Sequence, residues 1–133
     1  MVIDSSALVA LLLGEPETAS FVAAIAAASR RLVSTVSYLE TAIVITSRVG
    51  PSGLEKLDRL LGELSIELMA FTQDQMVLAI AAYRAYGKGS GHAAALNFGD
   101  CFSYALAKHL DEPLLFKGDD FSHTDIIPAF PVL

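Results

Sequence analysis

The stretch Met1-Val2-Ile3-Asp4-Ser5-Ser6-Ala7-Leu8 predicts a short buried strand that gives way, at an acid, to an apolar helix. The same alternation of short apolar runs with helix-length segments recurs along the chain. The predicted strands are 2–3, 32–35, 66–70 and 114–117, with a last one near 126–127 or 130, and the predicted helices are about 5–13, 17–28, 37–48, 52–64, 72–86 and 98–109. This order predicts a single domain, 1–133, with a helix-rich α/β fold: a three-layer α/β/α sandwich around a mainly parallel sheet.

Composition narrows the classes of protein to consider. The chain carries 9 Lys and Arg against 15 Asp and Glu, and 53% of its residues are hydrophobic. No uncharged apolar stretch is long enough to span a membrane. We therefore expect some of the apolar residues to form a surface that is covered by a second copy or another protein. A start without a basic region is unlike a signal peptide, and the single cysteine, Cys101, excludes an internal disulfide. We therefore expect a cytoplasmic protein with a buried, unreactive thiol.

Acids stand where the apolar elements begin or end. Asp4 follows the first strand, Glu40 and Asp100 lie near the starts of two helices, and Asp119-Asp120 follow the strand 114–117. The ends of parallel strands and the starts of the next helices meet at one edge of such a sheet. Carboxylates gathered there need a cation, and hard oxygen ligands suit Mg²⁺ or Mn²⁺. We predict a metal site of Asp4, Glu40, Asp100 and Asp119, with Ser6 beside it; Asp120 instead caps the turn or pairs with Lys117.

Each acid also has a purely structural explanation. Asp4 is placed to cap the helix that follows it. Ser37-x-x-Glu40 has the spacing of a capping box, and Asn97-x-x-Asp100 resembles a cap followed by an acid that favours the helix dipole. What favours a shared site is that all three acids fall at the same expected edge of the sheet.

The glycine-rich stretch Gly87-Lys88-Gly89-Ser90-Gly91 does not have the spacing of a phosphate-binding P-loop. We expect a flexible loop in which Lys88 contacts phosphate, and we take Lys117 as the second candidate contact with nucleic acid. The acidic average of the whole chain argues against strong non-specific binding to RNA, though not against a local site.

With the acids placed, the chain resembles the PIN-domain ribonucleases, and specifically the VapC toxins of type II toxin–antitoxin pairs. The matching segments are 1–8, Ser37-Tyr38-Leu39-Glu40, 94–105 and 114–121. The resemblance implies an endoribonuclease dependent on Mg²⁺ or Mn²⁺, an RNA substrate, a homodimer, and a cognate antitoxin that joins it in a hetero-oligomer.

Carried over by position, the family's first three acids match Asp4, Glu40 and Asp100. Many relatives place the fourth three residues before the phenylalanine equivalent to Phe121, and Gly118 stands there in this chain. The fourth ligand is therefore Asp119 or Asp120, or the site has three acids completed by water. In this interpretation Asp4 and Asp100 bind the principal metal, Glu40 helps to bind it and orients the attacking water, and Asp119 assists.

Two other classes of protein remain as alternatives. A receiver-type signalling domain also binds Mg²⁺ at strand ends, but it needs a second acid after the first strand and an Asp after a middle strand. The run 66–70 is instead followed by Phe71-Thr72. The other alternative is a PIN-like fold that has lost catalysis and binds proteins, against which stands the retention of the three principal acids.

Overall fold

A computed structural model describes residues 1–130. Its sheet has the strand order β3-β2-β1-β4, formed by β1 (Val2–Ile3), β2 (Leu32–Ser34), β3 (Glu67–Met69) and β4 (Leu114–Leu115). Every neighbouring pair is parallel, and Val2 lies opposite both Leu32 and Leu114. The predicted parallel sheet is confirmed.

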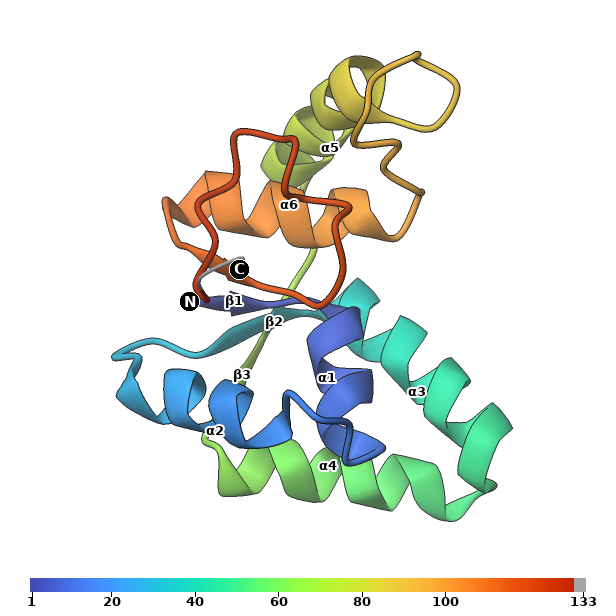
Figure 1. Cartoon of the computed structure of the whole chain (residues 1–133), viewed down its shortest axis with the longest axis vertical. Helices are drawn as coiled ribbons and strands as arrows, with labels where there is room; N and C mark the ends of the chain where they lie inside the picture. The colour runs from blue at the N-terminus through green and yellow to red at the C-terminus, as the bar shows by residue number, and fades with distance from the viewer. Residues whose placement is uncertain (131–133) are drawn as a thin grey trace.

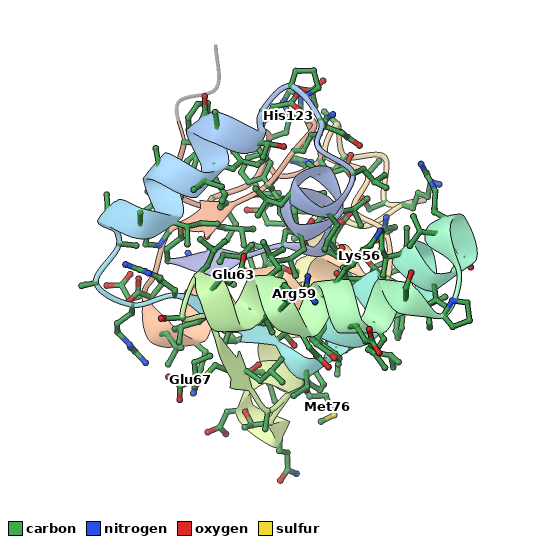
Figure 2. The ribbon with its side chains drawn as sticks, turned by 90° about the horizontal axis from the view of Figure 1, so that it is seen from below. Lys56, Arg59, Glu63, Glu67, Met76 and His123 are labelled. Atoms are coloured by element: carbon green, nitrogen blue, oxygen red, sulfur yellow. The ribbon has the colours of Figure 1, made fainter. Side chains whose placement is uncertain are left out.

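Helices cover both faces of the sheet. They are α1 (Ser5–Leu12), α2 (Thr18–Ala27), α3 (Thr35–Val49), α4 (Ser52–Glu63), α5 (Gln73–Tyr86) and α6 (Asp100–Leu110). In Figure 1, α5 and α6 lie on one side of the sheet and α1 to α4 on the other, which confirms the predicted three-layer sandwich. The charged side chains of α4, among them Lys56, Arg59 and Glu63, lie along its outer side (Figure 2).

Strands β1, β2 and β4 each contribute to two separate cores, because successive side chains point to opposite faces of a sheet. In the edge strand β3, by contrast, Glu67 and Leu68 are exposed. Ile3, Val33 and Leu115 pack with α1, α2 and α4, whereas Val2, Leu32 and Leu114 pack with α5, α6 and the C-terminal segment. All six side chains are at most 1% exposed. Burial on both faces explains why these six positions are all apolar rather than alternating with polar ones.

The start of α3 differs from the prediction. Ser34, the last residue of β2, caps the helix by accepting a hydrogen bond from the Val36 amide at 3.3 Å. Ser37 therefore lies inside the helix, where its hydroxyl is 3.0 Å from that of Ser103 on α6. The expected capping box of Ser37 and Glu40 is wrong, because the strand ends one residue earlier than its apolar pattern indicates.

The predicted last strand is also wrong within the described residues. Around position 128 the chain forms only one isolated bridge with β4. Leu114 donates its amide to the Ile127 carbonyl at 3.0 Å and accepts from the Ala129 amide at 2.8 Å. Pro128 between them has no N–H group to extend a ladder. In residues 1–130, no helix is long and apolar enough to cross a membrane.

Candidate active site

A cavity of about 380 Å³ opens where β1, α3, α6 and the segment after β4 meet. Three of the four predicted acids line it: Asp4, Glu40 and Asp100. Glu15 and Asp120 also line it, while Asp119, which we expected there, does not. The positive φ of Gly118, 98°, lets the chain turn sharply just before these two acids.

Asp4 is 3% exposed and caps α1 with a single oxygen. Its Oδ2 accepts hydrogen bonds from the Ser6 amide at 3.0 Å and from the Ser6 hydroxyl at 2.6 Å. The Ser6 hydroxyl in turn accepts from the Lys117 amide at 3.0 Å. Within residues 1–130 no hydrogen bond is made by Oδ1 of Asp4, so capping leaves this oxygen available to the cavity.

Asp100 is 8% exposed and is fixed by Asn97. The amide of Asn97 donates to Asp100 Oδ2, and the amide of Asp100 donates to Asn97 Oδ1, both at 2.9 Å. The predicted pairing of Asn97 with Asp100 therefore forms, but α6 begins at Asp100 with Gly99 at its N-cap position, two residues later than the predicted start at 98.

Burial raises the pKa of Asp100 to about 7. The Asn97 hydrogen bond opposes this shift, whereas the negative charges of Asp4 and Asp120 add to it. Both effects raise the pKa because burial and nearby negative charges disfavour the ionised form of a carboxyl.

Glu40 lies in the second turn of α3, half-buried, and reaches across to α1. Its Oε1 accepts a hydrogen bond from the Ser5 hydroxyl. No pattern in the sequence indicates this contact, because it joins two helices whose relative placement only the fold determines.

Lys117 is the one cation among the residues that line this cavity. Its ammonium group is ion-paired with Glu15 and lies 3.2 Å from Oε2 of Glu17. Hydrogen bonding to Glu15 raises the pKa of Lys117, so this side chain is charged at neutral pH. Sequence reasoning missed both glutamates, which lie between α1 and α2. Lys88 is exposed in the loop between α5 and α6 and does not line the cavity.

The donor set of the cavity fits a hard divalent cation, since it offers carboxylate oxygens and no nitrogen or sulfur ligand. As the side chains stand, no three acids, histidines or cysteines in residues 1–130 are close enough together to hold an ion. A small ion that keeps several waters, as Mg²⁺ does, needs only one or two direct carboxylate ligands.

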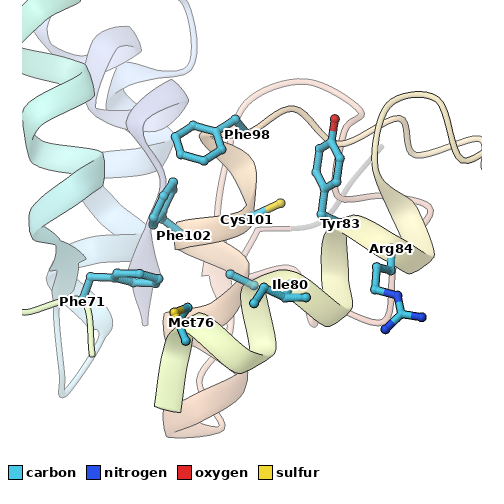
Figure 3. Close-up of a pocket in the computed structure, with 9 residues that line it drawn as sticks. Phe71, Met76, Ile80, Tyr83, Arg84, Phe98, Cys101 and Phe102 are labelled. Carbon is cyan, nitrogen blue, oxygen red and sulfur yellow. The ribbon is translucent and has the colours of Figure 1, made fainter. Parts of the chain in front are cut away.

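A second cavity, of about 470 Å³, has the opposite character and lies between α5 and α6 (Figure 3). It is lined by aromatic and aliphatic side chains, with Arg84 at one side and no acid: Phe71, Met76, Ala79, Ile80, Tyr83, Phe98, Cys101 and Phe102. The Phe102 ring packs edge-on against Phe98 and Phe71, with centroids 4.9 and 4.7 Å apart.

The thiol of Cys101 is buried, and burial, with the charge of Asp100, raises its pKa to about 11. The predicted burial of this thiol is confirmed, and a thiol with so high a pKa is hardly ionised at neutral pH.

Comparison with known proteins agrees with this architecture. A model of the PIN domain family matches residues 1–127. The chain is 57% identical over 126 residues to Ribonuclease VapC30 of Mycobacterium tuberculosis, with 95% of each chain covered. It is 55% identical to Ribonuclease VapC of Mycolicibacterium smegmatis, covering 95% of this chain and 97% of that one.

Two solved structures share the fold. One is the Mycobacterium tuberculosis toxin VapC20, described as cleaving the sarcin–ricin loop, with a TM-score of 0.75. The other is a toxin–antitoxin complex from Klebsiella pneumoniae, with a TM-score of 0.70. Each is 17% identical and covers 98% of both chains. The family model and the closely similar ribonucleases show that this chain belongs to the PIN-domain family and, within it, to the VapC ribonuclease toxins of toxin–antitoxin systems.

Proposed function

We propose that the acid cavity is the centre at which this chain hydrolyses RNA, with Mg²⁺ or Mn²⁺ held by Asp4, Glu40 and Asp100. The observation that carries the proposal is the convergence of these three carboxylates, from three separate elements, on one cavity where the pKa of Asp100 is raised to about 7. When bound, the cation would polarise the phosphoryl group and lower the pKa of the attacking water.

A neighbouring residue binds one carboxylate oxygen of each acid, and this determines the role that we propose for the acid. Ser6 fixes one oxygen of Asp4 and leaves Oδ1 for the cation. Asn97 holds Asp100 in the same way through Oδ2. Ser5 engages Oε1 of Glu40, so Oε2 is the oxygen that orients the attacking water and accepts its proton.

The test is cleavage of a labelled structured RNA by the purified chain with Mg²⁺, Mn²⁺ or EDTA. Asp4→Asn and Asp100→Asn should each lower the rate about 10²–10³-fold, the loss that removal of one charge-stabilising group typically causes. Cutting that survives both substitutions would refute the assignment. If neither cutting nor metal binding could be detected, the chain would be a protein-binding module instead.

For the fourth acid we propose Asp120 in place of Asp119. Asp120 lines the cavity and its charge raises the pKa of Asp100, and neither is found for its neighbour. The two adjacent acids form a matched pair: Asp120→Asn should slow cleavage at least tenfold, and Asp119→Asn should leave it unchanged. The reverse order would restore Asp119 as the assisting acid.

We also propose that this chain has a cognate antitoxin as partner, by analogy with the Klebsiella pneumoniae complex.

A further proposed partner is a second copy of this chain, bound on the face formed by α5 and Phe98. On α5, Met76, Val77, Ile80 and Tyr83 are all more than 40% exposed, and Phe98 is 76% exposed. The helices around 17–28 and 52–64 are less suitable for a dimer surface, since their large exposed apolar side chains in the described structure are Val22 and Leu54. Sedimentation over a range of concentrations tests the dimer: a chain that stays monomeric at 100 μM would contradict it.

A further inference from the structure

Gly99 lies at the start of α6, immediately before Asp100, and its backbone does not explain why it is a glycine. Its φ of −62° and ψ of −38° are ordinary right-handed helical values that any residue adopts. The reason must lie in what surrounds its α-carbon.

The space beside Gly99 is filled by one carboxylate. A Cβ added there would lie 3.0 Å from Cδ and 3.3 Å from Oε1 of Glu40, and closer still to Oε2. The three nearest atoms all belong to this side chain, and none is backbone. It is the carboxylate of Glu40, therefore, that leaves no room for a side chain at position 99.

The same carboxylate is held on another side by the Ser5 hydroxyl, which donates to Oε1. Ser5 can follow a small displacement of the carboxylate, but a methyl group at position 99 would occupy the place of Oε2. Glu40 thus depends on a hydrogen-bond donor from α1 and on an empty position at the start of α6.

We infer that Gly99 is a positioning residue of the nuclease site: the absence of its side chain sets where the Glu40 carboxylate stands relative to Asp4 and Asp100. This inference rests on the proposed function of the acid cavity. It explains a glycine at a helical position, where glycine otherwise only adds to the conformational entropy of the unfolded chain.

Replacing Gly99 by alanine should therefore lower activity without lowering the stability of the fold. The carboxylate is the far end of a flexible side chain, so Gly99→Ala is accommodated by movement of Glu40 rather than of the backbone. Because alanine fits these dihedral angles, the variant should unfold at the wild-type temperature or above it. The displaced atoms are nevertheless the ones that orient the attacking water.

The experiment compares wild type with Gly99→Ala and with Gly62→Ala, a matched control in α4 where an added Cβ meets nothing within 4 Å. For Gly99→Ala we expect kcat for RNA cleavage to fall about 10–100-fold, the effect of misplacing a reacting group by about 1 Å, with KM nearly unchanged. Its melting temperature in EDTA should not fall. Gly62→Ala should match wild type in both kinetic constants.

A double variant supplies a second readout. Glu40→Asp shortens the side chain by one methylene and withdraws the carboxylate from position 99, so this change should cost less in the Gly99→Ala background than alone. Additive losses, wild-type kcat in Gly99→Ala, or a lowered melting temperature in EDTA would each overturn the inference. If Asp4→Asn still cleaves RNA, the proposed site itself is wrong; if Asp4→Asn is inactive while Gly99→Ala is fully active, only the role of Gly99 is refuted.

Discussion

The acid cavity and the apolar cavity are similar in volume, about 380 and 470 Å³, and they adjoin at the start of α6. Asn97 and Asp100 line the first, whereas Phe98 and Cys101 line the second. In the acid cavity, separate hydrogen bonds fix Asp4, Glu40 and Asp100. The apolar cavity is made by side chains that merely pack together. Buried charged groups therefore have to be positioned one by one by hydrogen bonds, whereas an apolar surface needs only a partner that covers it.

The largest effect we expect comes from Asp100→Asn in the metal-free protein, where activity and stability should change in opposite directions. A carboxyl whose pKa is raised in the folded state stabilises the protein at low pH, and this contribution is lost as pH rises through the folded pKa. For Asp100 the loss falls between its usual pKa of 3.8 and about 7. Asparagine keeps an oxygen for the Asn97 amide and carries no charge, so this variant should be nearly inactive yet more stable than wild type at pH 8.

The measurement is the melting temperature in EDTA at pH 5 and at pH 8, with the exposed Asp119→Asn as control. Wild type and the control should lose stability between the two values, and Asp100→Asn should lose less. An equal decline in all three would mean that Asp100 is ionised throughout and that the cavity does not repel charge.

A smaller effect is expected at Ser6, which links the Lys117 backbone to Asp4. Removing its hydroxyl in Ser6→Ala deletes two hydrogen bonds and releases Asp4, so cleavage should slow about tenfold and stability should fall by about 1 kcal/mol. Kinetics and urea unfolding would be compared with Ser20→Ala on the exposed side of α2. Equal effects from the two serines would show that the link does not orient Asp4.

The two lysines provide the next contrast. Lys117 lines the acid cavity and Lys88 does not, so Lys117→Gln should weaken RNA binding several-fold more than Lys88→Gln. Loss of one phosphate contact should also lower the slope of log affinity against log salt by about 0.7. Fluorescence anisotropy on the inactive Asp4→Asn background separates binding from cleavage. Unchanged slopes for both variants would indicate that Glu15 and Glu17 keep Lys117 from the RNA.

The smallest effect on chemistry should come from the apolar face. Val77 is 61% exposed on α5 and lines neither cavity. Val77→Ser should therefore leave kcat and Mn²⁺ affinity within twofold of wild type, while it shifts the sedimentation profile toward monomer. A large fall in kcat at a protein concentration where wild type is monomeric would show that the two cavities are coupled.

Whether a contact can be predicted from the sequence depends on how local it is along the chain. The order of strands and helices along the chain and the pairing of Asn97 with Asp100 were predictable, because they depend on patterns within a few residues. The convergence of Asp4, Glu40 and Asp100 on one cavity was also predictable, since parallel strands bring their ends to one edge. Which of Asp119 and Asp120 lines the cavity was not, because it depends on the turn at Gly118. Nor were the contacts of Glu40 with Ser5 and Gly99, which require α1, α3 and α6 to be docked first.

The most direct test of the acid cavity as a metal-dependent centre is Mn²⁺ binding to the purified chain, measured by calorimetry without RNA. We predict saturable binding by wild type and by Asp119→Asn, and affinity weakened at least tenfold in Asp4→Asn and in Asp100→Asn. Binding that is undiminished in both of the latter variants would contradict the account, because the cation would then lie somewhere other than among these carboxylates.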